Sequence, residues 1–93
     1  MTVFVDSLRV ARASGPAFLV GKRNGHLWCH MMADSIEELH AFADRLGLKR
    51  RCCHVDHYDL TPGRRKTAVE LGAKEVNSRE LIRLRRQARI SGR

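Results

Sequence analysis

The hydrophobic positions of the first third of the chain form short runs that are typical of strands. Residues 2–5 are β-branched or aromatic and are followed by Asp6, which predicts a buried strand with a carboxylate at its C-terminal end. Residues 26–33 predict a second strand, and the Asn-Gly pair at 24–25 before them is a strong hairpin signal. The short apolar run at 17–20 is a candidate for the other strand of that hairpin.

Residues 35–46 have the clearest helical pattern in the chain. Their apolar positions, three or four residues apart, are Ile36, Leu39, Phe42, Ala43 and Leu46. Asp34 is a natural N-cap, and Ser35 and Glu38 have the spacing of a capping box. Gly47 stands where a left-handed C-cap belongs. The pattern therefore predicts a helix over residues 35–46.

The second half of the chain predicts an extended segment, a helix, a short strand and a last helix. Residues 48–55 are expected to be a strand or extended segment. The Thr-Pro pair at 61–62 predicts the start of a helix that ends at Gly72. Residues 73–76 are a short strand candidate, and the last helix is predicted over about 78–90.

This order of elements predicts one α/β domain over residues 1–93, with three helices packed against a three- to five-stranded sheet. Apolar residues make up 43% of the chain and aromatic residues 5%, so the core must be mostly aliphatic. No apolar run reaches the roughly 18 residues of a membrane span, and the N-terminus lacks the pattern of a signal peptide. Three cysteines, two of them adjacent, predict thiols in a reducing compartment, so we expect a cytoplasmic protein.

Three ordered blocks of residues cover nearly the whole chain. They are TVFVD at 2–6, HxxADSxxELHxFA at 30–43 with Gly47, and HYDLT at 57–61 followed by Arg65, Ala68, Gly72-Ala73 and Arg79-Glu80-Leu81. Together these blocks resemble a family of short bacterial and bacteriophage proteins known only as a domain of unknown function. The resemblance implies a compact domain of this length, often phage-encoded, and implies no reaction, cofactor or partner.

The positive charge is concentrated in the second half of the chain. The formal net charge is +8; residues 1–47 contain five Lys and Arg against five acids, and residues 48–93 contain thirteen against five. Such an asymmetric charge attracts phosphates or an acidic protein, although it also serves solubility alone. We therefore weigh nucleic-acid association against a non-catalytic module that docks on an acidic protein.

The basic residues of the second half predict a surface for nucleic acid. The candidate contacts are Arg64, Arg65, Lys66, Arg79, Arg83, Arg86 and Arg89. At 100° per residue, the last four of these fall on one face of the final helix, where they form a cationic stripe suited to a phosphate backbone. The alternative is an ordinary solvated helix face. Aromatic residues are not interleaved with these arginines, so base stacking is not indicated.

Four polar residues near predicted element ends form a candidate metal and catalytic site. Asp6, Asp34, His57 and Asp59 are the candidate ligands, and Mg²⁺ or Mn²⁺ is the expected metal. Asp6, His57 and Asp59 are also the candidate catalytic residues. A metal held there would activate water for hydrolysis of a phosphodiester or a nucleotide.

Ordinary structural roles compete with this hypothesis. Asp34 has a role as an N-cap, Asp59 can cap the turn that follows it, and His30 can be a half-buried, hydrogen-bonded side chain. A zinc site built on Cys52-Cys53 is disfavoured, because adjacent thiols in a strand point in opposite directions. The deciding observation is whether His30, His57 and Asp59 converge with Asp6.

Overall fold

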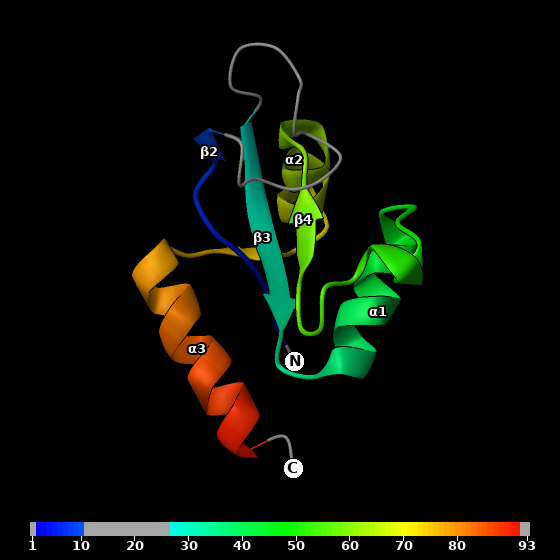
Figure 1. Cartoon of the computed structure of the whole chain (residues 1–93). Coiled ribbons are helices and arrows are strands. Elements are labelled where there is room, and N and C mark those ends of the chain that lie inside the picture. Colours follow the sequence, from blue (N-terminus) through cyan, green and yellow to red (C-terminus); the bar gives the residue numbers. More distant parts are fainter. Residues whose placement is uncertain (1, 11–26, 92–93) are drawn as a thin grey trace.

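The structure is a computed structural model that describes residues 2–10 and 27–91, with side chains up to Gln87. These residues form a five-stranded mixed sheet and three α-helices, which confirms the predicted α/β class (Figure 1). In chain order the elements are β1 Val3–Val5, β2 Arg9–Val10, β3 Leu27–Ala33, α1 Ile36–Arg45, the 3₁₀ turn η1 Arg50–Cys52, β4 Tyr58–Leu60, α2 Pro62–Glu70, β5 Lys74–Glu75 and α3 Ser78–Ser91.

Strand β3 is the centre of the sheet. It pairs in antiparallel fashion with β1, β2 and β4, and β1 pairs in parallel with β5. Met31 in β3 lies opposite both Val5 of β1 and Tyr58 of β4. Strands β1 and β4 therefore lie on opposite sides of β3. The predicted strand at 26–33 is therefore confirmed over Leu27–Ala33, and it makes the most strand contacts. The candidate strand at 17–20 and the turn at 24–25 lie outside the described residues.

A β-bulge at Asp6 separates β1 from β2. Between the pairs Val5–Met31 and Arg9–Trp28, the β1–β2 segment advances four residues while β3 advances three. The backbone N–H of Asp6 still donates to the carbonyl of His30, at 3.2 Å. The backbone N–H of His30 instead donates to the Asp6 side chain, at 2.7 Å. The bulge thus places a carboxylate inside the ladder, beside β3.

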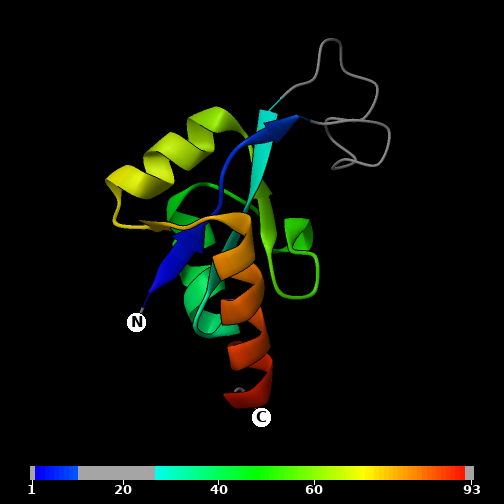
Figure 2. The ribbon, with the colours of Figure 1, turned by 90° about the vertical axis from the view of Figure 1, so that its left-hand side faces the viewer.

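The two faces of the sheet carry separate apolar clusters. The larger cluster packs under α1 and α2 and contains Val3, Val5, Cys29, Met31, Leu39, Phe42, Ala43, Leu46, Tyr58, Leu60, Ala68 and Ala73. The smaller cluster packs under α3 and contains Phe4, Met32, Val76 and Leu81, with Leu84 against it. Helix α3 lies on the opposite side of the sheet from α1 and α2 (Figure 2).

The N-cap of helix α1 is Ser35, one residue after the predicted Asp34. Ser35 has extended backbone geometry, and its hydroxyl accepts a hydrogen bond from the N–H of Glu38 at 3.2 Å. The carboxylate of Asp34 instead accepts from the N–H of Thr2, at 3.0 Å. The prediction of Asp34 as the N-cap was therefore wrong. Its side chain bonds the backbone just before β1 and so links the start of β1 to the end of β3. Gly47 has φ +75°, which confirms the predicted left-handed C-cap.

The signals at the other helix ends were correct. The hydroxyl of Thr61 accepts a hydrogen bond from the N–H of Arg64 at 3.3 Å, and α2 ends before Gly72, whose φ is +111°. Helix α3 is capped by Asn77, whose side-chain oxygen accepts from the N–H of Glu80 at 2.7 Å. Each of these signals lies within a few residues of the terminus that it predicts.

Residues 48–55 were expected to be a strand or an extended segment, and the strand was wrong. The segment contains the 3₁₀ turn Arg50–Cys52 and then a tight turn, in which His54 and His57 form an isolated antiparallel bridge. The three basic residues at 49–51 are all exposed, and the residues that pack against the core, Leu48 and Cys53, do not alternate as the buried face of a strand requires. The short turn places His57 directly before β4.

Candidate metal centre

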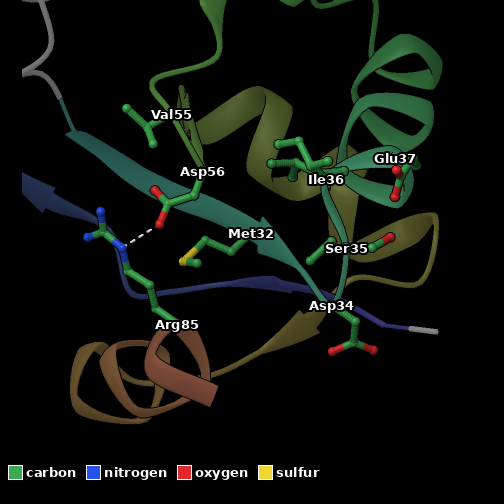
Figure 3. A pocket seen from close by; sticks show the side chains of 10 residues that line it. Met32, Asp34, Ser35, Ile36, Glu37, Val55, Asp56 and Arg85 are labelled. Atoms are coloured by element: carbon green, nitrogen blue, oxygen red, sulfur yellow. Dashed lines mark hydrogen bonds and ion pairs between the residues drawn. The ribbon is translucent and has the colours of Figure 1, made fainter. Parts of the chain in front are cut away.

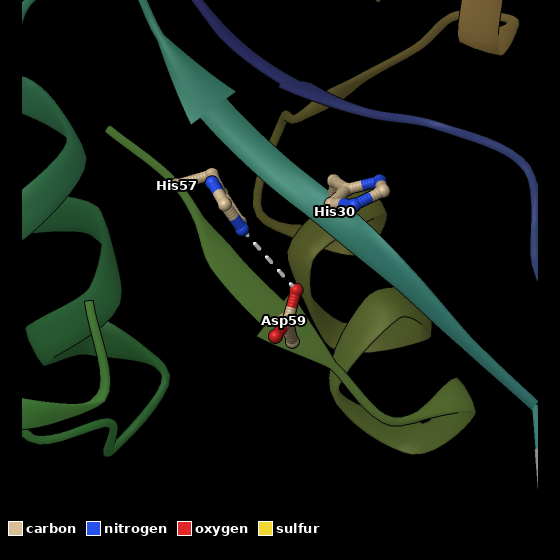
Figure 4. A group of neighbouring side chains, drawn as sticks. All are labelled: His30, His57 and Asp59. Carbon is tan, nitrogen blue, oxygen red and sulfur yellow. Dashed lines mark ion pairs between the residues drawn. The ribbon is translucent and has the colours of Figure 1, made fainter. Parts of the chain in front are cut away.

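The face of β3 and β4 that points away from the large core carries polar side chains. Successive residues of a strand point to opposite faces. The residues turned toward the α1–α2 core are Cys29, Met31, Tyr58 and Leu60. His30 and Asp59 are direct neighbours in the β3–β4 register and therefore lie together on the opposite face. His57, two residues before Asp59, joins them on that face (Figure 4).

His30, His57 and Asp59 converge closely enough to hold one metal ion. One potential ligand atom from each lies within 4.8 Å of the other two. The Asp59 side chain is only 8% exposed, and its Oδ1 receives no hydrogen bond within the described part of the chain. Nε2 of His57 lies 3.6 Å from this oxygen. A buried carboxylate oxygen without a hydrogen bond is unfavourable, and a bound cation removes that cost.

Each imidazole of this group is held through its Nδ1 atom by another carboxylate. Oδ2 of Asp6 lies 2.9 Å from Nδ1 of His30, and Oδ1 of Asp56 lies 3.2 Å from Nδ1 of His57. A histidine that donates from Nδ1 carries its lone pair on Nε2, the atom then available to a metal. This carboxylate–histidine arrangement is the one that orients metal-binding histidines in proteins.

Asp6 is buried and fully engaged. Its side chain is 1% exposed, and it accepts hydrogen bonds from the backbone and ring of His30 and from Arg9, the last at 3.1 Å. Burial pushes the pKa of Asp6 upward, but the bonds from His30 and the charge of Arg9 outweigh it and leave the pKa below its usual value. Asp6 is therefore an ionised group that positions His30.

Asp56 connects the group to α3. Its Oδ2 lies 2.6 Å from Nε of Arg85, while its Oδ1 faces His57. Burial raises the pKa of Asp56, and the hydrogen bonds from His57 and Arg85 lower it by more, so the net shift is downward. Neither Asp56 nor Arg85 was predicted as a residue of this site. The only available signal was the position of Asp56 directly before His57.

Two further rings surround the centre. His54 stacks on His57 with ring centroids 5.6 Å apart, and its Nε2 lies 3.6 Å from Oδ2 of Asp59. Trp28 meets His30 edge to face at a centroid distance of 4.7 Å. These rings limit the directions from which a ligand reaches His30 and His57.

The predicted ligand set is only partly brought together. His57 and Asp59 lie in the converging group, and Asp6 reaches it through His30. Asp34 is exposed, bonds the N-terminal backbone and lies outside the group. His30 takes the place predicted for Asp34, which changes the donor set from mainly carboxylates to two imidazoles and one carboxylate.

The cysteines do not contribute to the centre within the described part of the chain. Cys29 lies on the core face and is fully buried. Burial raises the pKa of its thiol to about 12, with the Asp6 charge adding to the shift. Cys52 is exposed and Cys53 is half-buried, and both are free thiols.

Two of the predicted nucleic-acid contacts are occupied within the fold. Arg65 donates from Nε to the backbone carbonyl of Asp6 at 2.9 Å and pairs with Glu75 at 3.1 Å. Arg64 donates to the carbonyl of Leu46 at the end of α1. Both arginines therefore brace α2 against neighbouring elements, although most of Arg64 is exposed.

The remaining predicted basic contacts are mostly free to face solvent. Lys66, Arg79 and Arg86 are exposed. The Arg83 side chain is 70% exposed and lies 3.8 Å from Glu80. The side chain of Arg89 lies outside the described residues. Leu81 is the described residue of α3 that is buried against the sheet. The exposed arginines therefore lie on the side of α3 that faces solvent.

Comparison with known proteins identifies a family for this chain, and the function of that family is unknown. None of the helices in the described residues has the length and apolar character needed to traverse a membrane. No curated protein and no solved structure matches the chain. Residues 17–88 match a family described as "Protein of unknown function (DUF4031)". This match spans most of the chain, and the protein belongs to that family.

Proposed function

We propose that the protein is a metal-dependent hydrolase of a phosphodiester or a nucleotide. The observation that carries this proposal is the convergence of His30, His57 and Asp59, with a buried Asp59 oxygen that lacks a hydrogen bond. Three protein ligands leave coordination positions open for water and substrate, as in catalytic metal sites. A metal in such a site lowers the pKa of bound water toward about 7 and so supplies a nucleophile.

The donor set favours a particular class of metal. Two imidazoles and one carboxylate suit Zn²⁺ or Mn²⁺ better than Mg²⁺, which prefers oxygen ligands. Asp6 and Asp56 act as positioning residues, because they hold the two rings through Nδ1. Arg85 supports a phosphate-containing substrate, since it lines a small cavity with His30 and His57.

A metal titration tests the site without relying on turnover. The full-length protein is treated with a chelator and titrated with Zn²⁺, Mn²⁺ and Mg²⁺, followed by calorimetry and by fluorescence of Trp28, the chain's single tryptophan. We expect one ion per chain and a fluorescence change, because Trp28 contacts His30. H57A and D59A should each weaken binding by at least about tenfold. D44A, which removes an exposed carboxylate on α1, should not.

Hydrolysis is then measured with bis(4-nitrophenyl) phosphate, a generic phosphodiester. The reaction should require the metal and be lost in H57A and D59A. If none of the three metals binds the native protein, or if the variants bind as the native protein does, the proposal is wrong.

Non-catalytic association with nucleic acid is the second candidate. It is supported by the +8 charge and by the exposed side chains of Lys66, Arg79, Arg83 and Arg86. Binding of labelled DNA and RNA oligonucleotides at several salt concentrations tests it. Changing Arg79, Arg83 and Arg86 to Gln together should reduce the affinity and the salt slope. Capture of the same partner from nuclease-treated lysate would indicate an acidic protein in place of nucleic acid.

A cytoplasmic location is part of this proposal. Cys29, Cys52 and Cys53 are free thiols, which is typical of proteins that work in reducing compartments. A phage origin is an implication of the family resemblance and has no bearing on the chemistry of the site.

A further inference from the structure

A pocket adjoins the candidate metal centre. It has a volume of about 480 Å³ and opens between the N-terminal turn of α1, the 54–57 turn and α3 (Figure 3). This size falls within the range of about 300–1,000 Å³ that is typical of pockets for small organic ligands. Met32 and Arg85 line the pocket and also line the cavity of about 50 Å³ next to His30 and His57. The pocket and the small cavity beside His30 and His57 therefore adjoin at Met32 and Arg85.

Two exposed apolar side chains form opposite walls of the pocket. Val55 is 88% exposed and Ile36 is 42% exposed, and Met32 lies between them (Figure 3). The backbone of Val55 has φ +60°, a left-handed conformation that β-branched residues strongly avoid. Strain of this kind is typical of ligand sites, where it presents a side chain that a relaxed turn would not. Exposed apolar walls around a concave space indicate a ligand with an apolar part.

The pocket has one cationic side chain among its polar lining residues. Arg85 lies on the side shared with the small cavity beside His30 and His57, and its Nε is hydrogen-bonded to Asp56, which also lines the pocket. Asp34, Ser35 and Glu37, at the start of α1, provide oxygen atoms on the other side. The matching ligand carries an anionic group that reaches the Arg85 guanidinium, an apolar part in the middle, and hydroxyl or amino donors at the other end.

We propose that this pocket binds the nucleoside part of a nucleotide, with the phosphate at Arg85 beside the metal centre. This inference rests on the proposed function, because the phosphate is the group that the metal centre would hydrolyse. The base packs between Val55 and Ile36, and sugar hydroxyl or base amino groups donate hydrogen bonds to Glu37. A free nucleotide and the terminal nucleotide of a strand share this chemistry, and the experiment separates them.

Binding of simple probes to the full-length protein tests the pocket, with and without Zn²⁺. The probes are AMP, ribose 5-phosphate and inorganic phosphate, and affinities are measured by calorimetry. AMP should bind at least about tenfold more tightly than ribose 5-phosphate, because only AMP places a base between the apolar walls. A short oligonucleotide with a terminal adenosine 5′-phosphate reveals, by a higher or lower affinity than AMP, which of the two sources the pocket prefers.

Two variants locate the base, and one serves as a control. I36S removes one apolar wall, and V55N removes the other with a residue that tolerates positive φ. Each should weaken AMP by about fivefold or more and leave inorganic phosphate unchanged. L71S, which changes an exposed leucine at the end of α2 outside the pocket, should leave the affinities for AMP and for phosphate unchanged. Circular dichroism confirms that each variant is folded.

The results separate this inference from the proposed function. If ribose 5-phosphate binds as tightly as AMP, or if I36S and V55N bind AMP as the native protein does, the nucleoside pocket is wrong. In that case metal-dependent hydrolysis of bis(4-nitrophenyl) phosphate by the native protein still upholds the proposed function. Preferred binding of AMP to a protein that takes up no metal would uphold the pocket and overturn the hydrolase.

Discussion

The two faces of the sheet are built from the same strands and differ in how much apolar surface they bury and in the polar side chains that they carry. Toward α1 and α2, the strands bury a continuous apolar cluster that includes Met31 and Leu60, each 0% exposed. Toward α3, alternate positions in β3 and in β4 with the residue before it carry His30, His57 and Asp59, beside a cluster with four buried members among the described residues. One face therefore buries most of the apolar side chains of the described residues, and the other carries the candidate metal ligands.

The polar face also contains features that a structural role alone does not require. Asp59 has a buried oxygen without a hydrogen bond, and Val55 has a left-handed backbone. Such features lower stability and persist at sites where function depends on them. Mutations on the two faces should therefore have opposite patterns of effect on stability and on ligand binding.

The largest expected effect on stability comes from the core face. L60A should lower the free energy of unfolding by about 2–5 kcal/mol, because it leaves a cavity under α1 and α2. Urea denaturation followed by circular dichroism measures the change. L71A, at an exposed leucine, should change it by less than about 0.5 kcal/mol. A loss at Leu60 no greater than that at Leu71 would contradict the assignment of this face as the source of stability.

A smaller loss is expected at Asp6, where the two faces meet in the bulge. D6N should cost about 1–3 kcal/mol, since the amide cannot accept from both His30 and Arg9 as the buried carboxylate does. It should also weaken metal binding by about 10–100-fold through the His30 ring. Urea denaturation and metal titration are the two measurements. D44N, on the exposed side of α1, is the control, and an unchanged metal affinity in D6N would refute the positioning role.

Asp59 should show the reverse pattern. D59N should change the free energy of unfolding of the metal-free protein by no more than about 0.5 kcal/mol, because the carboxylate oxygen that it replaces has no hydrogen bond. The same variant should lose most of its metal affinity, since the amide is a poor ligand. A large loss of stability together with unchanged metal binding would show that Asp59 is structural.

The smallest perturbation is thiol labelling, which compares the faces without mutation. Cys52 is exposed and should react first with iodoacetamide at neutral pH, followed by half-buried Cys53. Cys29 should remain unmodified until the protein unfolds, because it is fully buried and its pKa is raised to about 12. Mass spectrometry of peptides after timed labelling gives the order. Modification of Cys29 at the rate of Cys52 would show that the core face opens readily.

Much of the fold was predictable because its signals are local. Thr61 and Gly47 were correctly identified as helix ends from the residues immediately around them. The prediction of a strand failed at residues 48–55, where the exposed basic residues 49–51 interrupt the apolar positions and the chain forms a 3₁₀ turn. It also failed at Asp34, where two adjacent cap-forming residues compete and only the contact with Thr2 decides between them.

The candidate site was predictable only in part. His57 and Asp59 stand two residues apart, so their shared face follows from strand periodicity alone. His30 was recognised as a candidate neighbour, and its contact with Asp6 depends on a one-residue bulge that no local pattern announces. Asp56 and Arg85 were missed because their roles depend on how α3 packs against the 54–57 turn.

By itself, the sequence determined the class of fold, the three helices with most of their ends, and the excess of positive charge in the second half. These properties depend on residues within a few positions of one another or on composition. Only the tertiary structure decided that His30 pairs with Asp59, that Asp6 supports His30, and that Asp34 lies outside the group. The reason is that strand register and helix packing bring together residues far apart in the chain, and a shift of one residue would send these side chains to the opposite face.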